Sequence, residues 1–372
     1  KFEDYGIYTQ VEQLNKTALK SHGLDSNGQL YKINSFEFYR YEDIIKKEDD
    51  AGYDKTAFEK MLEIKGDSDH TKLIDMLTDL NDYSIGIEDV LKEHFDEENI
   101  VYWMAFQILM GNVDTQNRNV YLYSPLNSDI WYFIAWDNDG CLMRPEYELR
   151  NFSDQNSWEK GISNYWGNIL FQRCLKSRSF REKLNDAILD LREYLNKDML
   201  TSKIESYKNV LKPYLYLMPD AEYEPLTSEQ YDQIAASLPD EIEKNYQLYL
   251  ESLETPMPFY IGVPSIDGDK LKFNWDVSYD LDAEDITYSV EVARDYLFQD
   301  VIYQNTTLTV PESEMELPNA GQYFVRVRAT NTSGKTQDAF DYYVTDEGKH
   351  YGMRCFYITE DSTVEEDDYE EG

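Results

Sequence analysis

Long apolar runs, cysteine and histidine are all scarce in this chain of 372 residues. No run reaches the length of about 18 apolar residues that a membrane-spanning helix needs, so no membrane span is expected. The three cysteines, Cys141, Cys174 and Cys355, are an odd number without metal-like spacing. They indicate neither a disulfide framework nor a zinc site, although a single bridge stays an open alternative. The four histidines are scattered and form no metal-binding pattern.

Basic residues are also few relative to acidic ones. The chain has 35 Lys and Arg against 73 Asp and Glu, which gives a formal net charge of -38. Nucleic acid and an anionic membrane surface would both be repelled, so neither is expected as a partner. Solubility explains the charge, and attraction of basic substrates is the alternative. The sequence gives no indication of the oligomeric state.

The stretch from Gly111 to Gly140 contains two acidic loops around a predicted hairpin. Residues 97–110 before it are apolar on almost every face, which predicts a buried helix. Residues 119–124 and 131–136 are rich in aliphatic and aromatic residues and predict two strands joined by a polar turn. Asp114 therefore precedes the hairpin, Asn119 is the first residue of its first strand, and Asp137 follows the hairpin.

This order of polar residues is typical of a phosphoryl-transfer site. Such a site needs a carboxylate that orients the attacking hydroxyl, and oxygen ligands that hold magnesium against the phosphates of ATP. Protein kinases supply an Asp, an Asn five residues later, and a metal-binding Asp after a hairpin. The His-Arg and Phe-Gly that flank these residues in kinases are replaced here by Asn112-Val113 and Asn138-Asp139-Gly140.

The same residues resemble the CotH kinase family, the secreted atypical kinases named for a spore-coat protein. The matching elements are Asp114 to Asn119, Val120-Tyr-Leu-Tyr123, Trp131-Tyr-Phe-Ile134 and Trp136-Asp-Asn-Asp139, with Tyr5-Gly-Ile-Tyr8, Val11-Glu12-Gln13 and Leu30-Tyr31-Lys32 upstream. The resemblance runs from about Tyr5 to about Tyr249. Two departures are Asn138 between the aspartates and Gly140-Cys-Leu-Met143 in place of the family's aromatic-Gly ending.

The resemblance implies a kinase-like fold and ATP-dependent phosphorylation of Ser or Thr in an extracellular or cell-surface protein, with Mg²⁺ or Mn²⁺. It implies Asp114 as the catalytic aspartate and Asn119 and Asp137 as metal ligands, with Asp139 as a further candidate ligand. Lys32 matches the family's Tyr-Lys and is the candidate for binding the phosphates; a solvent-facing strand lysine is the alternative. Glu12 is its candidate partner, or one half of a surface pair.

The N-terminus of the chain bears on the expected completeness of the kinase-like domain. No signal peptide is visible, and the chain begins at Lys1 within a predicted strand. In the family, the first strands and the loop that covers the ATP phosphates would lie before Tyr5. We therefore expect the N-terminal part of the domain to be missing, and expect a secreted or cell-surface location.

Local patterns predict the remaining elements of this region. A strand is expected over residues 5–12 and another over 30–38, and helices are expected from apolar residues at three- and four-residue spacing. Thr227 and Gln230 have the spacing of a capping box, which predicts a helix that continues to about Leu253. The expected helices cover residues 16–21, 57–65, 70–80, 87–95, 97–110, 168–175, 180–195, 199–211 and 227–253.

A second domain is predicted after residues 254–258, where two prolines suit a short linker. Short alternating runs follow, which are typical of a β-sandwich. Inward-pointing positions are expected around Trp275, namely Val290, Val292, Tyr323, Val325 and Val327. The run from Gly321 to Ala329, followed by Asn331 and Gly334, resembles a fibronectin type III domain. Residues 346–372 are densely acidic, which predicts a tail or linker.

The predicted fold is α+β: a divergent protein-kinase-like domain over residues 1–253, a linker over 254–258, an all-β fibronectin III-like sandwich over 259–345 and an acidic tail over 346–372. Three functions compete. The first is a secreted kinase that transfers the γ-phosphate of ATP to a protein. The second is an inactive kinase-like surface or assembly protein that acts through its β-sandwich. The third is a metal-dependent hydrolase that uses Asp114 and Asp137 as acid and base.

Overall fold

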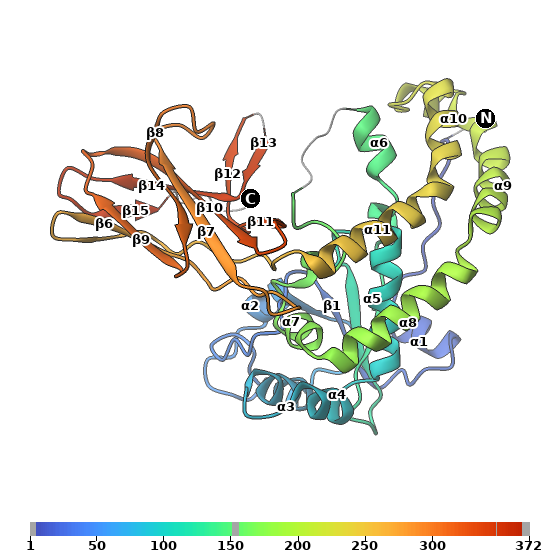
Figure 1. Cartoon of the computed structure of the whole chain (residues 1–372). Helices are drawn as coiled ribbons and strands as arrows, with labels where there is room; N and C mark the ends of the chain where they lie inside the picture. Colours follow the sequence, from blue (N-terminus) through green and yellow to red (C-terminus); the bar gives the residue numbers. More distant parts are fainter. Residues whose placement is uncertain (1–4, 151–155, 347, 367–372) are drawn as a thin grey trace. The chain divides into compact units, whose positions relative to one another are not determined.

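The computed structural model describes residues 5–150, 156–346 and 348–366 (Figure 1). The chain divides into two compact units that are each assembled from two stretches of sequence. Residues 1–151 and 168–247 form the first unit, and residues 152–167 and 248–372 form the second. The second unit thus takes an internal segment from the region that resembles a kinase.

The first unit is built on a four-stranded antiparallel sheet in the order β2-β1-β3-β4. Its strands are β1 (Gln29–Ile33), β2 (Leu62–Ile64), β3 (Val120–Ser124) and β4 (Tyr132–Ala135). Every residue of β3 is buried, because both faces of the sheet are covered. On one face Leu19 of α1 (Lys16–Ser21) packs against Leu30 and Tyr121. On the other face, the ring centroid of Phe133 of β4 lies 5.0 Å from that of Trp103 of α5 (Glu97–Met110).

The helix α5 confirms the prediction of a buried helix. Its apolar residues face in all directions and most of them are buried, including Trp103, Met104 and Leu109. The Asp96 side chain accepts a hydrogen bond from the Asn99 backbone N–H at the start. Gly111 ends the helix with a φ of 62°, the left-handed conformation that glycine adopts without strain. The loop of residues 111–119 begins from this end.

Most of the other predicted helices are confirmed, and α6 lies where no helix was predicted. The further helices are α2 (Lys55–Met61), α3 (Thr71–Asn81), α4 (Ile87–His94), α6 (Arg144–Leu149), α7 (Ile169–Lys176), α8 (Arg178–Tyr194), α9 (Lys197–Leu215), α10 (Ser228–Ser237) and α11 (Glu241–Glu254). The predicted capping box of Thr227 and Gln230 is present at the start of α10. The capping residues of a helix can therefore be read from local sequence.

Some boundaries differ from the predictions. Residues 5–12 form no strand; Ile7 N donates instead to Asp220 Oδ1 over 2.9 Å. The predicted strand over residues 30–38 ends at Ile33, and residues 62–64 form β2 rather than the end of a helix. The helix expected over 227–253 is interrupted by a 3₁₀ turn at Leu238–Asp240. Pro239 explains the interruption, because it lacks the N–H that a continuous helix needs.

The second unit is rich in β-strands, as expected. One sheet has the order β15-β14-β10-β7-β8 with β11 paired to β10, a second has the order β5-β6-β9, and β12 pairs with β13. All five predicted inward positions and Trp275 are buried in one core. The strands are β5 (Ser265–Asp267), β6 (Lys270–Asn274), β7 (Ile286–Ala293), β8 (Val301–Leu308), β9 (Glu312–Glu316), β10 (Gly321–Asn331), β11 (Thr336–Asp338), β12 (Tyr342–Thr345), β13 (Gly348–Tyr351), β14 (Met353–Ile358) and β15 (Val364–Glu366).

The region expected to be an acidic tail contains three of these strands, β13, β14 and β15. The strand β14 pairs with the long strand β10 in the middle of the larger sheet. Phe356 and Ile358 of β14 are buried in the core of the unit. Residues 348–366 are therefore an integral part of the β-rich unit, and the rest of the expected tail, 367–372, lies outside the described residues.

Residues 156–167 belong to the second unit through side-chain contacts. The ring centroid of Trp158 lies 5.1 Å from that of Phe340 and 6.2 Å from that of Tyr351. Gln337 Nε2 donates a 2.8 Å hydrogen bond to Ser157 Oγ. Further along, the Trp166 ring stacks on Tyr279 at 5.5 Å. This segment is thus fixed by residues from β11, β13 and the loops of the β-rich unit.

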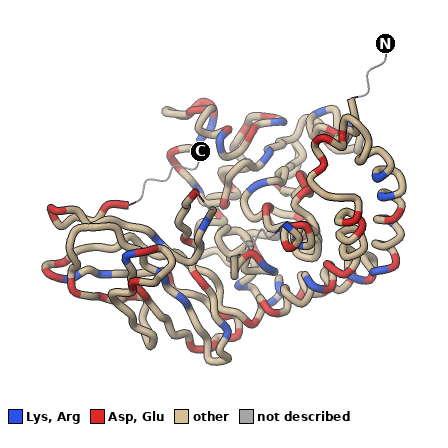
Figure 2. The backbone as a smooth tube through the Cα atoms, turned by 90° about the horizontal axis from the view of Figure 1, so that it is seen from above, with Lys and Arg blue, Asp and Glu red and all other residues tan. Residues whose placement is uncertain are grey.

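Asp and Glu are distributed along both units rather than gathered on one segment (Figure 2). The net charge of -38 is therefore not due to one acidic segment. Among the residues that the structure describes, no helix is both long and apolar enough to cross a bilayer.

Candidate functional site

The C-terminal end of α5 holds two loops together. Gln107 Nε2 donates to Asn138 Oδ1 over 3.1 Å, and Asn112 Nδ2 donates to Gln107 Oε1 over 3.1 Å. The backbone N–H of Leu142 donates to the carbonyl of Met110 over 2.8 Å. The loop before β3 (residues 111–119) and the loop after β4 (residues 137–143) are therefore anchored to the same turn of one buried helix.

The structure brings Asp114 and Asn119 together in the first of these loops. Asn119 Nδ2 donates a 2.7 Å hydrogen bond to Asp114 Oδ2. Arg118 Nε lies 2.6 Å from the other carboxylate oxygen, Asp114 Oδ1. The Asp114 side chain remains 45% exposed. Its carboxylate is thus oriented by two neighbours and stays accessible to solvent.

The hairpin places Asn119 and Asp137 at the same end of the sheet. Val120, the first residue of β3, pairs with Ala135, the last residue of β4. Asn119 comes directly before this pair, and Asp137 comes two residues after it. Both have left-handed backbones, with φ of 57° and 54°, a conformation that Asn and Asp tolerate better than most residues. The chain turns sharply at both positions as it leaves the sheet.

The second loop packs closely against the first. A Cβ atom on Gly140 would lie 2.8 Å from Asn112 Oδ1 and 4.0 Å from Asp114 Cβ. Only glycine allows this approach without a shift of Asn112. Asp137, Asn138 and Asp139 are all exposed, and the Asn138 side chain also accepts hydrogen bonds from Gln107 and Asn112. The residue that separates the two aspartates therefore anchors the loop, and the aspartates face solvent.

Side chains that local sequence patterns did not indicate also hold the loop of residues 111–119 in place. Asn117 Nδ2 donates to Glu37 Oε1 over 2.7 Å, and the Asn117 carbonyl accepts from Phe36 N over 2.8 Å. Asn168 Nδ2 donates to the Gln116 carbonyl over 2.8 Å. Asn168 also caps α7, where its side chain accepts from Leu170 N. The capping pattern of Asn168 can be recognised in the sequence, but nothing in the sequence links Asn168 to Gln116.

The structure places Lys32 and Glu12 in different surroundings. Lys32 lies in the middle of β1, opposite Tyr121 of β3 and Glu63 of β2. The Glu12 carboxylate is 2.6 Å from His22 Nε2, and this hydrogen bond is the main cause that lowers the pKa of Glu12. No ion pair joins Glu12 to Lys32 in the described part of the chain.

The donor atoms available in the two loops suit a hard divalent cation. Asn119 uses its Nδ2 on Asp114, which leaves its Oδ1 as an acceptor for a ligand. Asp137 and Asp139 offer carboxylate oxygens, and oxygen ligands are those that Mg²⁺ and Mn²⁺ prefer. Burial raises the pKa of the nearby Cys141 thiol to about 12, so a thiolate ligand is unfavourable.

The charged side chains of the two loops do not form a complete metal centre by themselves. Among the residues that the structure describes, no three His, Cys, Asp or Glu side chains lie close enough to form a metal site. An amide oxygen from Asn119 and two exposed carboxylates are the donors present. A metal ion held by these side chains would need further ligands, such as phosphate oxygens.

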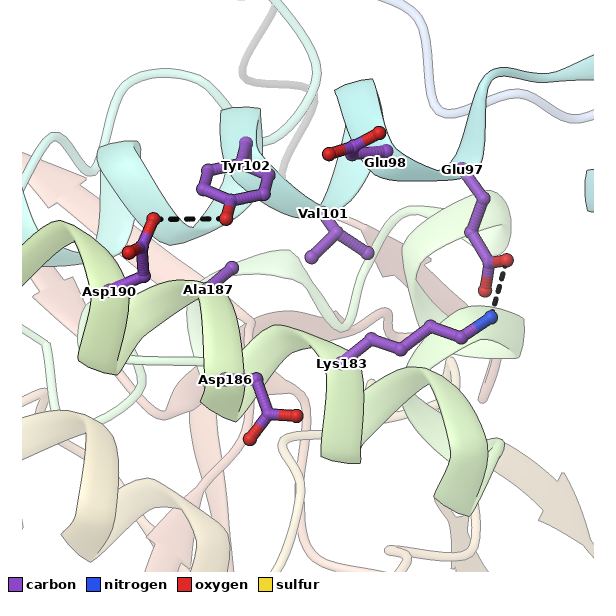
Figure 3. Close-up of a pocket in the computed structure, with 8 residues that line it drawn as sticks. All are labelled: Glu97, Glu98, Val101, Tyr102, Lys183, Asp186, Ala187 and Asp190. Atoms are coloured by element: carbon purple, nitrogen blue, oxygen red, sulfur yellow. Dashed lines mark hydrogen bonds and ion pairs between the residues drawn. The ribbon is translucent and has the colours of Figure 1, made fainter.

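A separate groove of about 500 Å³ lies between α5 and α8 (Figure 3). It opens on the first turns of α5, whereas the two loops follow its last turn; a helix of 14 residues is about 21 Å long. Lys183 Nζ pairs with Glu97 at 2.5 Å, and the Tyr102 hydroxyl donates to Asp190 at 3.0 Å. Four of its polar side chains thus pair with one another, at the opposite end of α5 from the loop of Asp114.

Comparison with known proteins identifies the first region of the chain. The model of the CotH kinase protein family matches residues 1–249, and no curated protein matches. Among solved structures, the surface layer protein SbsC, domains 1–6, is similar at 11% identity over 89% of this chain, which spans 41% of that chain. Its TM-score of 0.16 is too low to support an argument about fold or function. Since the family match covers about two thirds of the sequence, including both loops at the end of α5, the chain belongs to the CotH kinase family.

Proposed function

We propose that this protein is an atypical kinase that transfers the γ-phosphoryl group of ATP to Ser or Thr of an extracellular or cell-surface protein. Membership of the CotH kinase family supports the reaction class. The observation that carries the proposal is the 2.7 Å hydrogen bond from Asn119 to Asp114 at the end of the hairpin that leads to Asp137. It joins the residue proposed to orient the acceptor with one proposed to hold the metal.

Each residue of the site has a proposed role. Asp114, held by Asn119 and Arg118, accepts the hydrogen bond of the substrate hydroxyl and orients it for attack. Asn119 Oδ1, Asp137 and Asp139 would hold Mg²⁺ or Mn²⁺. The ion would neutralise charge on the ATP phosphates. Lys32 is proposed to contact those phosphates, and because Glu12 binds His22, no role in holding Lys32 is proposed for it.

The β-rich unit is proposed to be a fibronectin III-like module that attaches or spaces the kinase unit. Its antiparallel sheets and the buried core around Trp275 support this proposal. Modules of this kind usually bind or space rather than catalyse. The alternative function, an inactive kinase-like surface or assembly protein, would act through its fold and this unit.

Calorimetric titration of ATP with Mg²⁺ or Mn²⁺ tests the proposal. We expect metal-dependent binding to the intact chain and its loss in Asp137→Ala. Asp129→Ala is the matched control, because Asp129 is an exposed aspartate in the turn at the opposite end of the same hairpin. Equal binding by both variants and the intact chain would overturn the assignment of the site.

A second measurement separates the candidate functions. Transfer of labelled phosphate from ATP to the chain itself or to a general acceptor protein should occur with the intact chain and disappear in Asp114→Asn. Binding of ATP without any transfer would favour the inactive assembly protein. Hydrolysis of an ester or glycoside without nucleotide would point to the hydrolase instead.

A further inference from the structure

Arg144, the first residue of α6, makes two polar contacts directly after the loop of Asp137. Its Nη1 lies 3.2 Å from Glu241 Oε2, and its Nη2 donates a 2.5 Å hydrogen bond to Asn245 Oδ1. Both partners are on α11 and both are buried; Glu241 is 1% exposed. The two contacts use the fork of the guanidinium, which a lysine cannot reproduce.

Asn245 extends this contact to the end of α5. Its Nδ2 donates a 2.9 Å hydrogen bond to the carbonyl of Leu109. The last carbonyls of a helix have no partner within the helix, so Asn245 satisfies one of them. Gly111 lies so close that a Cβ atom there would be 2.7 Å from Asn245 Nδ2. The amide of Asn245 thus bridges Arg144 and the turn from which the loop of Asp114 begins.

Glu241 provides the charge that keeps Arg144 in place. Its carboxylate lies in the first turn of α11, where the helix dipole favours a negative charge. Lys244 Nζ is 2.6 Å from Glu241 Oε1, so the carboxylate keeps one cationic partner when Arg144 is changed. A buried carboxylate with no partner would be strongly destabilising, and Lys244 limits that effect. Replacement of Arg144 should therefore release the loop without unfolding the unit.

We infer that Arg144, Glu241 and Asn245 are positioning residues that set where the carboxylates of Asp137 and Asp139 lie relative to Asp114. The loop is fixed by β4 at its start, by Leu142 N on the Met110 carbonyl near its end, and by Arg144 directly after it. Asn245 connects Arg144 to the same turn of α5 from which the loop of Asp114 begins. The catalytic consequence rests on the proposed function; the anchoring of the loop does not.

Hydrogen exchange of the intact chain tests the anchoring. In Arg144→Lys, amides of residues 136–143 should exchange faster than in the unchanged protein, while the thermal unfolding midpoint changes little. Asn245→Ala is the second variant and should accelerate the same amides. Arg192→Lys is the matched control, because Arg192 of α8 pairs with Glu243 of α11, whose side chain is 56% exposed, whereas that of Glu241 is 1% exposed. Unchanged exchange of residues 136–143 in both variants would overturn the inference.

Binding of Mn²⁺ with ATP tests the consequence for the site. Its affinity should fall by about tenfold to a hundredfold in Arg144→Lys, as for other residues that orient metal ligands, and should be unchanged in Arg192→Lys. Equal affinity in the intact chain and Arg144→Lys would contradict the positioning role. If the intact chain binds no Mn²⁺ with ATP, the proposed function fails, and the exchange experiment alone decides whether the three residues anchor the loop.

Discussion

Asn119 Nδ2 donates a 2.7 Å hydrogen bond to Oδ2 of Asp114, five residues earlier in the chain. The contact requires the chain to turn back within one loop, and Asn119 makes this turn with a φ of 57°. Since the carboxylate can only accept, the orientation of the amide is determined, and its oxygen points away from Asp114. One side chain thus orients the acidic group and presents an oxygen to a ligand.

Two substitutions at Asn119 should separate its backbone from its side chain. Asn119→Gly keeps the left-handed backbone without strain, and Asn119→Ala adds about 1–2 kcal/mol of strain. We expect both variants to lose metal-dependent binding of ATP, and only the alanine variant to lose stability. Calorimetry and urea unfolding measure the two effects. Native-like ATP binding by Asn119→Gly would show that the amide is dispensable.

Gly140→Ala should disturb the packing of the two loops. The added methyl group would lie 2.8 Å from Oδ1 of Asn112, which is buried and also holds Asp114 N. Overpacking of this kind costs about 1–3 kcal/mol, so both the stability and the affinity for Mn²⁺ with ATP should fall. Gly86→Ala is the control, because its nearest contact would be 3.7 Å away. Equal unfolding midpoints for the two variants would contradict this account.

Arg118→Gln should affect the reaction more than the fold. The pair of Arg118 with Asp114 is about half exposed, and exposed ion pairs contribute at most about 1 kcal/mol. Because Arg118 orients Oδ1 of Asp114, kcat for phosphate transfer should fall while the KM for ATP stays unchanged. Steady-state kinetics check this expectation. A raised KM with unchanged kcat would instead assign Arg118 to nucleotide binding.

Cys141 should make stability decrease in alkaline solution. Burial raises the pKa of its thiol to about 12, above the usual value of 9.0. Above pH 9 the unfolded chain loses this proton and the folded chain keeps it, so the stabilisation present at lower pH is lost as the pH rises towards 12. Urea unfolding at pH 7 and pH 10 should show a smaller decrease in Cys141→Ala than in the intact chain. Equal decreases in the two proteins would show that the folded thiol titrates normally.

Trp158→Ala should loosen the internal segment held by the β-rich unit. Loss of the contacts with Phe340 and Tyr351 should destabilise the second unit by about 1–3 kcal/mol. Trypsin should then cleave after Lys160 faster than in the intact chain. Tyr223→Ala, a change at an aromatic residue that is 79% exposed, should leave this cleavage rate unchanged. An unaltered rate in Trp158→Ala would mean that the tryptophan does not fix the segment.

Local patterns predicted the elements whose information is contained in neighbouring residues. The uniform apolar character of residues 97–110 predicted α5, and the spacing of Thr227 and Gln230 predicted the capping box of α10. The pairing of Asp114 with Asn119 also lies within one loop, so their spacing was informative. These features depend on interactions between residues at most a few positions apart.

Distant contacts could not be read in this way. Asn245 reaches Leu109 across more than a hundred residues, and no local pattern links the two residues. The acidic composition after Asp346 indicated disorder, yet Phe356 and Ile358 lie in a strand paired with β10. Pairing with a buried strand outweighed composition there. Tertiary context therefore decided both the supports of the site and the extent of the β-rich unit.

Because residues 156–167 pack within the second unit, the two units cannot be separated by a single cut in the chain. A cut between Gln247 and the prolines near Pro256 would strip Trp158 and Trp166 of the aromatic rings they pack on, and would leave those rings open to water. Neither half would be self-sufficient. A chimera that transplants the C-terminal module onto another enzyme would have to carry this internal stretch with it.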